Sequence, residues 1–487
     1  MTSMENETKL RRTHFTIQLR RENNEESFHK ARRQMINTRD KIEVENSAVI
    51  SEMFSQNMMR LKQAENIQEL MAALISTRSL MSATNDVGQV PVREFLASGL
   101  LDPVMALARG DPSFPERDRE VTQVEALWIV SNLVLCPVEF YPKLLALGLL
   151  EMIDETLGSD DPNILKHSLW IISNLVVEDA SIFAAFVKRE TLARAVRAIG
   201  QFMDYFIIVK SAARMLSNVS RVRDFLPPEL EKKFVSLAFE IIRKYKDLEI
   251  MSEALWTVNF FIDRQDDYNW RVEYVGSFNM ESYLIEFLSS ARTDINRPAV
   301  RILGFLSLAE AKISTKILTP TFFSLLPSLL NCESPSFLTD VLWIVTNLVL
   351  TDELSHNSLF DDIYLEPIMR IITRPYVQNQ SESAVFALTS FIVFASKEDL
   401  KVLINDYGVI EVIFRQLNRP DVSKDYIEKC LSFLLSILRF ENANGECGVK
   451  AHFLSSQIAM NIQSIGFENH DKIKELIDNI SVELGSA

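Results

Sequence analysis

The chain contains 487 residues, of which 47% are hydrophobic, with only 13 glycines and 16 prolines. Such a composition supports an extensive core, and so few turn-forming residues disfavour a sheet-rich fold. The formal net charge of −15 disfavours nucleic acid as a ligand, because phosphate binding depends on Lys and Arg side chains.

The first 33 residues differ in charge from the rest of the chain. They carry eight basic and five acidic side chains, a net charge of +3, which leaves −18 on the remainder. Their apolar residues form only a weak helical stripe, so two interpretations stand: a disordered, solvated tail, or an arm that folds on a partner. Residues 34–64 are polar without a clear stripe, and we expect a linker there.

Helical periodicity begins after this linker. In residues 92–113, Gly99 separates two short apolar stretches, and Gly110 ends the second before a longer helical stretch. Residues 141–163 repeat this plan, with Gly148 at the first boundary. Two short helices followed by a long one indicate an armadillo repeat rather than a HEAT repeat.

The long helical stretches share a Trp four residues before an Asn. This pair occurs in EALWIVSN, HSLWIISN and DVLWIVTN, and four degenerate copies occupy the same phase. On a helix, positions i and i+4 lie on one face, so the indole and the carboxamide project side by side. The anchor positions are separated by 42, 44, 42, 45, 42 and 43 residues: Trp128, Trp170, Arg214, Trp256, Arg301, Trp343 and Phe386.

A fixed period of this length predicts an all-α fold, an armadillo-repeat superhelical solenoid of about ten repeats over residues 65–487, preceded by the basic amino-terminal arm. A single Trp in such a pattern is more often an ordinary core residue. A core Trp does not require an Asn one turn later, however, so the repeated pairs favour a continuous groove.

The sequence contains no motif typical of an enzyme or a metal site. The six histidines are scattered without metal-ligand spacing, and neither a Gly-rich phosphate loop nor a nucleophile motif is present. We therefore expect no catalysis and no cofactor. Cys136, Cys332, Cys430 and Cys447 have no paired spacing and are expected to be free thiols in a reducing compartment. No apolar run is long enough to cross a bilayer, and the first residues do not resemble a secretory signal.

The repeated Trp/Asn pair suits an extended peptide. Such a peptide exposes backbone N–H and C=O groups, and a row of carboxamides can donate to and accept from them. A slot between adjacent indoles accommodates the methylene stem of a Lys, whose ammonium meets the π faces of the rings. The pattern therefore predicts a groove that binds Lys- and Arg-rich peptide.

With its basic arm and two Trp/Asn blocks separated by Arg301, nearly the whole chain resembles the importin-α family. The segment EALWTVNFFID is similar to the family's fifth-repeat motif, with Asp263 trailing. The resemblance implies a nuclear import adaptor that binds Lys/Arg-rich nuclear localisation signals and links this cargo to importin-β. It also implies recycling by a nuclear export factor, and shuttling between cytoplasm and nucleus.

The resemblance assigns residues to three surfaces. Its major peptide site corresponds to Trp128, Asn132, Trp170, Asn174, Glu178, Asn218, Glu253 and Trp256. Its minor peptide site corresponds to Arg301, Asp340, Trp343, Asn347 and Phe386. The importin-β-binding arm, residues 1–33, corresponds to Arg11, Arg12, Leu19, Arg20, Arg21, Lys30, Arg32 and Arg33. Arg221 and Glu253 match an ion pair that frames the family's major groove.

Several positions depart from the family's pattern. Arg214 stands where the fourth repeat has its Trp, and Phe305 and Ser390 replace Asn residues of the ladder. Glu178 replaces an Asp, and its neighbour Val177 replaces a Gly. We hypothesise either that Arg214 limits affinity for lysine in the adjacent slot, or that it pairs with an acid such as Glu253 or Asp204 and selects another ligand.

Two alternatives remain beside an import adaptor. One is an armadillo scaffold that binds other extended peptides without import activity, for which the basic arm would be unnecessary. The other is a nucleic-acid-binding helical repeat, which the charge of −18 outside the arm disfavours.

Overall fold

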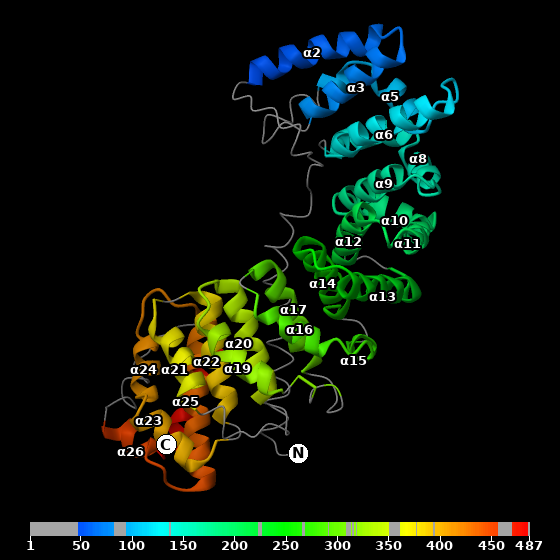
Figure 1. The fold of residues 1–487 in the computed structure, drawn as a ribbon. Coiled ribbons are helices and arrows are strands. Elements are labelled where there is room, and N and C mark those ends of the chain that lie inside the picture. Colours follow the sequence, from blue (N-terminus) through cyan, green and yellow to red (C-terminus); the bar gives the residue numbers. More distant parts are fainter. Residues whose placement is uncertain are drawn as a thin grey trace. The chain divides into compact units, whose positions relative to one another are not determined.

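A computed structural model of the chain describes residues 47–81, 94–135, 138–222, 226–264, 268–290, 292–307, 313, 316–317, 319–349, 361–375, 377–392, 395–455 and 470–485. Every regular element in these ranges is a helix. The chain divides into two compact units (Figure 1), here called the amino-terminal unit, described within residues 47–264, and the carboxy-terminal unit, described within residues 268–485.

The amino-terminal unit combines short and long helices: α2 Ser47–Gln63, α3 Ile67–Met81, α5 Leu101–Ala108, α6 Glu116–Leu133, the 3₁₀ turn η2 Val138–Phe140, α7 Tyr141–Ala146, α8 Leu149–Thr156, α9 Pro162–Leu175, α10 Ala180–Lys188, α11 Thr191–Gln201, α12 Phe206–Arg221, α13 Pro228–Lys244 and α14 Leu248–Ile262. The long helices α3, α6, α9, α12 and α14 each contact the next. A second row, α8, α11 and α13, also packs in succession. This stacking is typical of a helical-repeat solenoid.

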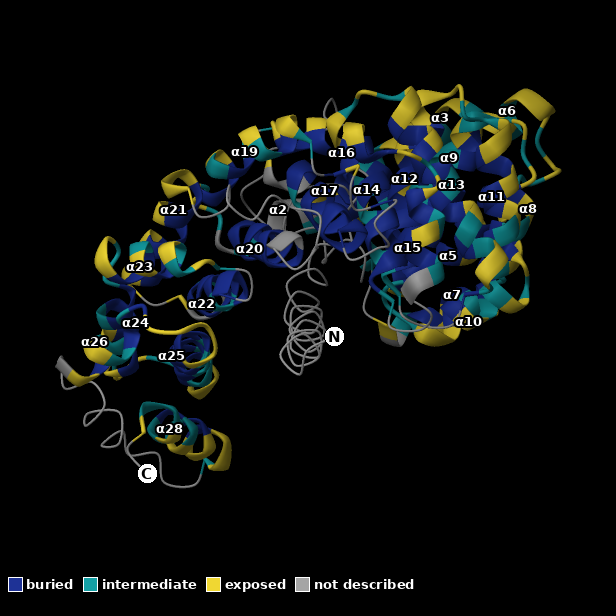
Figure 2. Cartoon of the chain, turned by 90° about the horizontal axis from the view of Figure 1, so that it is seen from below, coloured by how far each residue is buried: buried dark blue, intermediate teal, exposed yellow. Residues whose placement is uncertain are grey.

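The carboxy-terminal unit follows the same plan: α15 Tyr268–Gly276, α16 Glu281–Leu288, α17 Thr293–Leu306, α19 Pro320–Leu330, α20 Pro335–Val349, α21 Asp362–Thr373, α22 Gln378–Ile392, α23 Lys397–Asn405, α24 Val409–Leu417, α25 Lys424–Asn444, α26 Val449–Ser455 and α28 Asp471–Leu484. Here α17, α20, α22 and α25 pack in succession, and α28 covers the last of them. Figure 2 shows α20, α22 and α25 as mostly buried helices, while α19, α21 and α23 carry exposed residues on their outer sides. The predicted α solenoid of armadillo-like repeats is confirmed.

Local sequence signals set the helix boundaries. Gly148 adopts a left-handed conformation, with φ of 77°, at the start of α8, where a side chain would also collide with Arg109. The Asp161 carboxylate accepts a hydrogen bond from the Asn163 N–H, and Pro162 occupies the first turn of α9. At the start of α10, the Asp179 carboxylate accepts hydrogen bonds from the N–H groups of Ser181 and Ile182. At the start of α14, the Asp247 carboxylate accepts from the N–H groups of Glu249 and Ile250.

The linker predicted over residues 34–64 ends earlier than expected, because residues 47–63 form α2. Phe54 is fully buried, and the Asn57 amide donates to the carbonyl oxygen of Ala73 and to Thr77 Oγ1 on α3, at 2.9 and 2.6 Å. These contacts stabilise a helix whose own apolar stripe is weak. Residues 34–46, and the arm of residues 1–33, lie outside the described residues.

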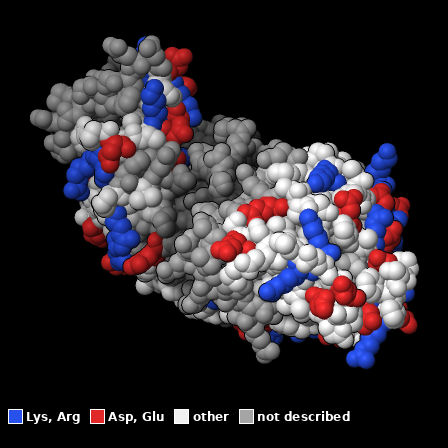
Figure 3. Space-filling model, turned by 90° about the horizontal axis from the view of Figure 1, so that it is seen from above, with Lys and Arg blue, Asp and Glu red and all other residues white. Residues whose placement is uncertain are grey.

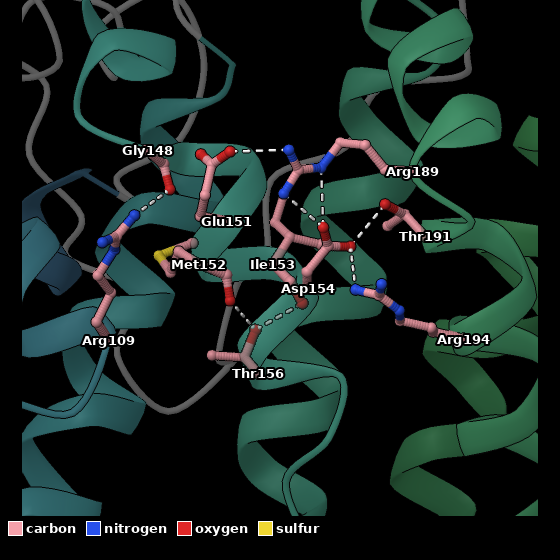
Figure 4. Close-up of polar contacts among 10 residues, drawn as sticks. All are labelled: Arg109, Gly148, Glu151, Met152, Ile153, Asp154, Thr156, Arg189, Thr191 and Arg194. Atoms are coloured by element: carbon pink, nitrogen blue, oxygen red, sulfur yellow. Dashed lines mark hydrogen bonds and ion pairs between the residues drawn. The ribbon is translucent and has the colours of Figure 1, made fainter.

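Polar side chains join neighbouring repeats through α8 and α11 (Figure 4). Asp154 on α8 binds Arg189 through Nε and Nη2 at 2.9 and 2.7 Å, Arg194 Nη1 at 3.3 Å, and Thr191 Oγ1 at 2.6 Å. One carboxylate thereby fixes the end of α10 and the start of α11 against α8. The Arg109 guanidinium forms a similar tie, donating to the Gly148 carbonyl oxygen at 2.7 Å.

Among the described residues, no helix is both long and apolar enough to span a membrane. Within the same ranges, no cluster of three or more His, Cys, Asp or Glu side chains is arranged to hold a metal ion.

Candidate functional site

The Trp/Asn pairs of the amino-terminal unit lie on long helices that pack in succession. Trp128 and Asn132 lie on α6, and Trp170 and Asn174 on α9. Further candidate residues lie on the next two long helices: Asn218 on α12, with Glu253 and Trp256 on α14. Glu178 lies half-buried in the turn after α9. The structure therefore brings the predicted major-site residues onto one row of helices.

The two members of each pair differ in exposure. The indoles of Trp128, Trp170 and Trp256 are partly exposed, whereas Asn132 and Asn174 are fully buried. The indole is thus the accessible half of each pair.

The carboxamides link successive long helices. Asn218 Nδ2 donates to both the carbonyl oxygen and Oγ of Ser173 on α9, each at 2.9 Å. In the carboxy-terminal unit, Asn347 Nδ2 donates to the Gly304 carbonyl oxygen on α17 at 3.0 Å. Both hydrogens of the Asn218 amide are thus used within the chain, and the residue is only 2% exposed, so this carboxamide serves the packing of α12 against α9.

Cations of the chain itself lie against the indoles. The Arg78 guanidinium is 4.1 Å from the centroid of the Trp128 ring, and Lys166 Nζ is 5.1 Å from it. Arg214 is 5.0 Å from the centroid of the Trp170 ring. These separations are within the range of cation–π attraction. Two of the predicted lysine-binding rings therefore already interact with a cation.

Both arginines are paired with carboxylates. Arg78 Nε lies 2.6 Å from Glu125 Oε2, and Arg214 Nη1 lies 3.7 Å from Glu253 Oε1. Asp204, the other acid considered for Arg214, pairs with Lys244. Of the two hypotheses for Arg214, the geometry agrees with an ion pair to Glu253.

Two aromatic residues of α14, Trp256 and Phe260, stack on each other. The rings of Trp256 and Phe260 are 5.4 Å apart with an interplanar angle of 27°, and Arg221 lies 5.1 Å from the Phe260 ring. Phe260 thus supplies a ring surface where other copies of the motif have an Asn.

His167, three residues before Trp170, is fully buried and lies 5.3 Å from the Trp128 ring. Ser131 Oγ contacts both the Leu127 carbonyl oxygen, at 2.8 Å, and His167 Nδ1, at 3.3 Å. Burial, followed by the positive charges of Lys166 and Arg78, lowers the pKa of His167 well below its ordinary value. His167 is therefore an uncharged side chain at neutral pH.

The predicted minor-site residues surround a buried Trp. Trp343 is 3% exposed, and its ring meets that of Phe305 edge-on at 4.9 Å and 73°. The indole also packs over Gly304, where an added Cβ would lie 2.4 Å from Trp343 Cζ3. Phe305 and Gly304 thus hold the indole inside the unit, and Trp343 does not form an open slot there.

Asp340 is the buried acid of this region. It binds Arg301 Nη1 at 3.1 Å and Arg297 Nε at 2.9 Å, and its side chain is fully buried. Phe386 on α22 is half-buried, and the Ser390 hydroxyl donates to the Phe386 carbonyl oxygen at 3.0 Å. Ser390 therefore stays on its own helix, whereas Asn347 reaches across to α17.

Sequence reasoning missed two cations beside the Trp128 ring, Arg78 and Lys166, and also missed Arg297, which binds Asp340. A signal was present for two of them: Lys166 lies four residues before Trp170, and Arg297 four residues before Arg301. One helical turn places them on the face of the anchor. Arg78 has no such signal, because it precedes Trp128 by 50 residues.

On the face seen in Figure 3, Lys and Arg side chains are intermixed with Asp and Glu over the described surface. The excess of acidic residues in the sequence does not gather into one patch on this face.

No protein-family model matches the chain, and no curated protein matches it. Solved structures do match. A crystal structure of an engineered protein aligns with a TM-score of 0.70 at 15% identity, over 91% of this chain and 100% of that one. A structure from a study of the phosphorylation switch that controls the interaction between cadherin and β-catenin aligns with a TM-score of 0.51 at 13% identity, over 90% and 96%. These similarities place the chain in the class of armadillo-like helical-repeat folds.

Proposed function

We propose that the protein is a binding scaffold for extended peptides, and that the row of long helices in the amino-terminal unit forms the binding face. The observation that carries this proposal is the set of partly exposed indoles on one row of packed helices, Trp128 on α6, Trp170 on α9 and Trp256 on α14. Aromatic rings at regular intervals suit a ligand whose side chains recur with the regular spacing of an extended chain.

Within this class, we propose a nuclear import adaptor similar to importin-α. Its ligands would be Lys/Arg-rich nuclear localisation signals, and residues 1–33 would bind importin-β through their basic side chains. A nuclear export factor would recycle the adaptor between nucleus and cytoplasm. The resemblance of the arm and of the Trp/Asn blocks supports this proposal, as does the acidic remainder of the chain.

A specific observation favours a second candidate, an armadillo scaffold that binds other extended peptides without import activity. Arg78 and Arg214 already lie against the Trp128 and Trp170 rings, and Phe305 packs against Trp343. Each contact occupies part of a ring that a cargo lysine would require.

Binding by the full-length protein separates these candidates. An import adaptor should bind a lysine-rich nuclear localisation peptide, and should bind its Lys→Ala counterpart much more weakly. The double variant Trp128→Ala/Trp170→Ala should lose roughly two orders of magnitude in affinity while staying helical by circular dichroism, because paired aromatic anchors act as hot spots. Trp270→Ala on α15 is the matched control and should bind like the parent.

Capture of importin-β tests the proposed role of the basic arm. The full chain should capture importin-β, and a chain lacking residues 1–33 should not. If neither chain captures importin-β while an extended peptide still binds, the scaffold is the correct class. If the double variant binds peptide as tightly as the parent, the assignment of the face to α6, α9 and α14 is wrong.

A further inference from the structure

Lys166 on α9 occupies an unusual place on the proposed peptide-binding face. It lies one helical turn before Trp170 and reaches across to α6, where its ammonium is 5.1 Å from the centroid of the Trp128 ring. The ammonium therefore stands beside the ring that a ligand lysine would be expected to approach.

One acid whose charge acts on Lys166, Glu125, already has a partner. Glu125 lies three residues before Trp128 on α6, and its carboxylate binds Arg78 at 2.6 Å. The ion pairs among the described residues include none made by Lys166. Two cations thus lie next to the Trp128 ring, and among the described residues Arg78 has an ion-pair partner while Lys166 has none.

The side chain of Lys166 is also largely removed from water. Burial lowers the pKa of its ammonium, and the positive charge of Arg78 lowers it further, while Glu125 and Asp161 act in the opposite direction. A charged group with reduced hydration gains from a nearby counter-charge and is destabilised by a second charge of its own sign.

We propose that Lys166 is a specificity-determining residue that selects a carboxylate, an Asp or Glu side chain of the bound peptide, at the position next to Trp128. The inference rests on the proposed peptide-binding function and narrows its ligand class. The preferred ligand is a peptide of mixed charge, with an acidic residue at the position that meets Trp128, rather than an uninterrupted run of Lys and Arg. A ligand lysine at that position brings a second ammonium toward Lys166 and Arg78.

The test is a charge-reversal cycle with the full-length protein. The probes are a labelled lysine-rich peptide and a set of single Lys→Glu replacements along it, with affinities measured by fluorescence anisotropy. The protein variants are Lys166→Glu and the neutral Lys166→Gln. Lys210→Gln on α12 is the matched control, because Lys210 is an exposed lysine paired with Glu249.

We expect one Lys→Glu peptide to bind the parent protein about tenfold more tightly than the all-lysine peptide, because a partly desolvated charge pair replaces a like-charge contact. Lys166→Glu should reverse that order, Lys166→Gln should abolish it, and Lys210→Gln should leave it unchanged. Comparing both peptides on each protein cancels changes that do not involve this pair of charges.

Three results would overturn the inference. In the first, no acidic replacement improves binding to the parent protein. In the second, an acidic replacement in the peptide improves binding to Lys166→Gln as much as it improves binding to the parent protein. In both cases the peptides bind, so the proposed function stands. In the third, no peptide of either charge binds to any variant, which overturns the proposed function and this inference together.

Discussion

The guanidinium of Arg214 lies 5.0 Å from the centroid of the Trp170 ring, at a position where the repeat pattern otherwise favours a Trp. Arg214 is 4% exposed, and Glu253 on the next long helix balances its charge at 3.7 Å. A buried, paired arginine thus takes one face of a ring on the proposed peptide-binding surface.

Arg214→Gln removes this cation while keeping a polar side chain. Basic peptide should then bind about tenfold more tightly, because a repulsive charge is gone and Glu253 becomes available to the ligand. Stability should fall by about 1–3 kcal/mol, since the partly buried Glu253 loses its partner. Isothermal titration and urea unfolding measure the two effects, with Lys210→Gln on the same helix as control. Weaker binding of basic peptide by Arg214→Gln would show instead that Arg214 contributes directly to ligand binding.

Gly304→Ala tests the packing of Trp343. The added methyl group would lie 2.4 Å from Trp343 Cζ3, so the indole must shift, and we expect a loss of about 1–3 kcal/mol in unfolding free energy. Gly200→Ala on α11 is a matched control with no atom within 4 Å of the added methyl group, and it should stabilise the protein by about 0.5–1 kcal/mol. Thermal unfolding compares the two variants. Equal stability of Gly304→Ala and the parent protein would contradict the close approach of α17 and α20.

Asp154→Asn tests the polar tie between repeats. The carboxylate binds Arg189, Arg194 and Thr191 together, and its side chain is only 9% exposed. We expect a loss of about 1–3 kcal/mol in unfolding free energy, because two guanidinium groups lose a charged acceptor. The control Glu229→Gln removes an exposed pair with Lys232 and should cost less than about 0.5 kcal/mol. Urea unfolding of both variants gives the comparison, and similar losses in the two would argue against a special role of Asp154.

The pKa of Glu441 predicts that the stability of the protein falls at acidic pH. Burial alone would raise the pKa of its carboxyl group, but N–H groups of Cys447, Gly448, Val449 and Lys450 donate to it and outweigh burial, so its pKa is lowered from the ordinary 4.5. The contribution of the Glu441 carboxylate to stability is therefore complete above pH 4.5, the ordinary pKa of the group. It is lost as the pH falls below 4.5 and passes the lowered pKa of the folded state. Urea unfolding between about pH 6 and pH 3 should show a smaller acid-induced loss in Glu441→Gln than in the parent protein. Equal losses in the two proteins would contradict this role.

Most of the fold could be predicted from the sequence because its signals are local. Gly148, and Asp161 followed by Pro162, mark helix boundaries through the conformations and hydrogen bonds of adjacent residues. The repeat period also carries information about tertiary packing, because each long helix meets the copy that precedes it. The helix α2 was not predicted from the sequence, because contacts with another helix stabilise it. One of them is the hydrogen bond from the Asn57 amide to the Ala73 carbonyl oxygen on α3.

The candidate site could be predicted only in part. The Trp/Asn spacing correctly places Trp128 and Trp170 on one row of packed helices, and it identifies the partly exposed indoles. The same spacing at Trp343 and Asn347 leads instead to a buried indole, because the residues that decide its exposure, Gly304 and Phe305, belong to the preceding repeat.

The sequence by itself determined the helical repeat, its period and the face on which each Trp projects, because these follow from spacing within single helices. Only the tertiary structure decided what each indole meets. Arg78 reaches Trp128 from 50 residues earlier in the chain, and Arg214 reaches Trp170 from the following repeat. The side chain that an adjacent repeat packs against each indole therefore decides its environment. Arginines lie against the partly exposed rings of Trp128 and Trp170, whereas Phe305 packs against the buried ring of Trp343.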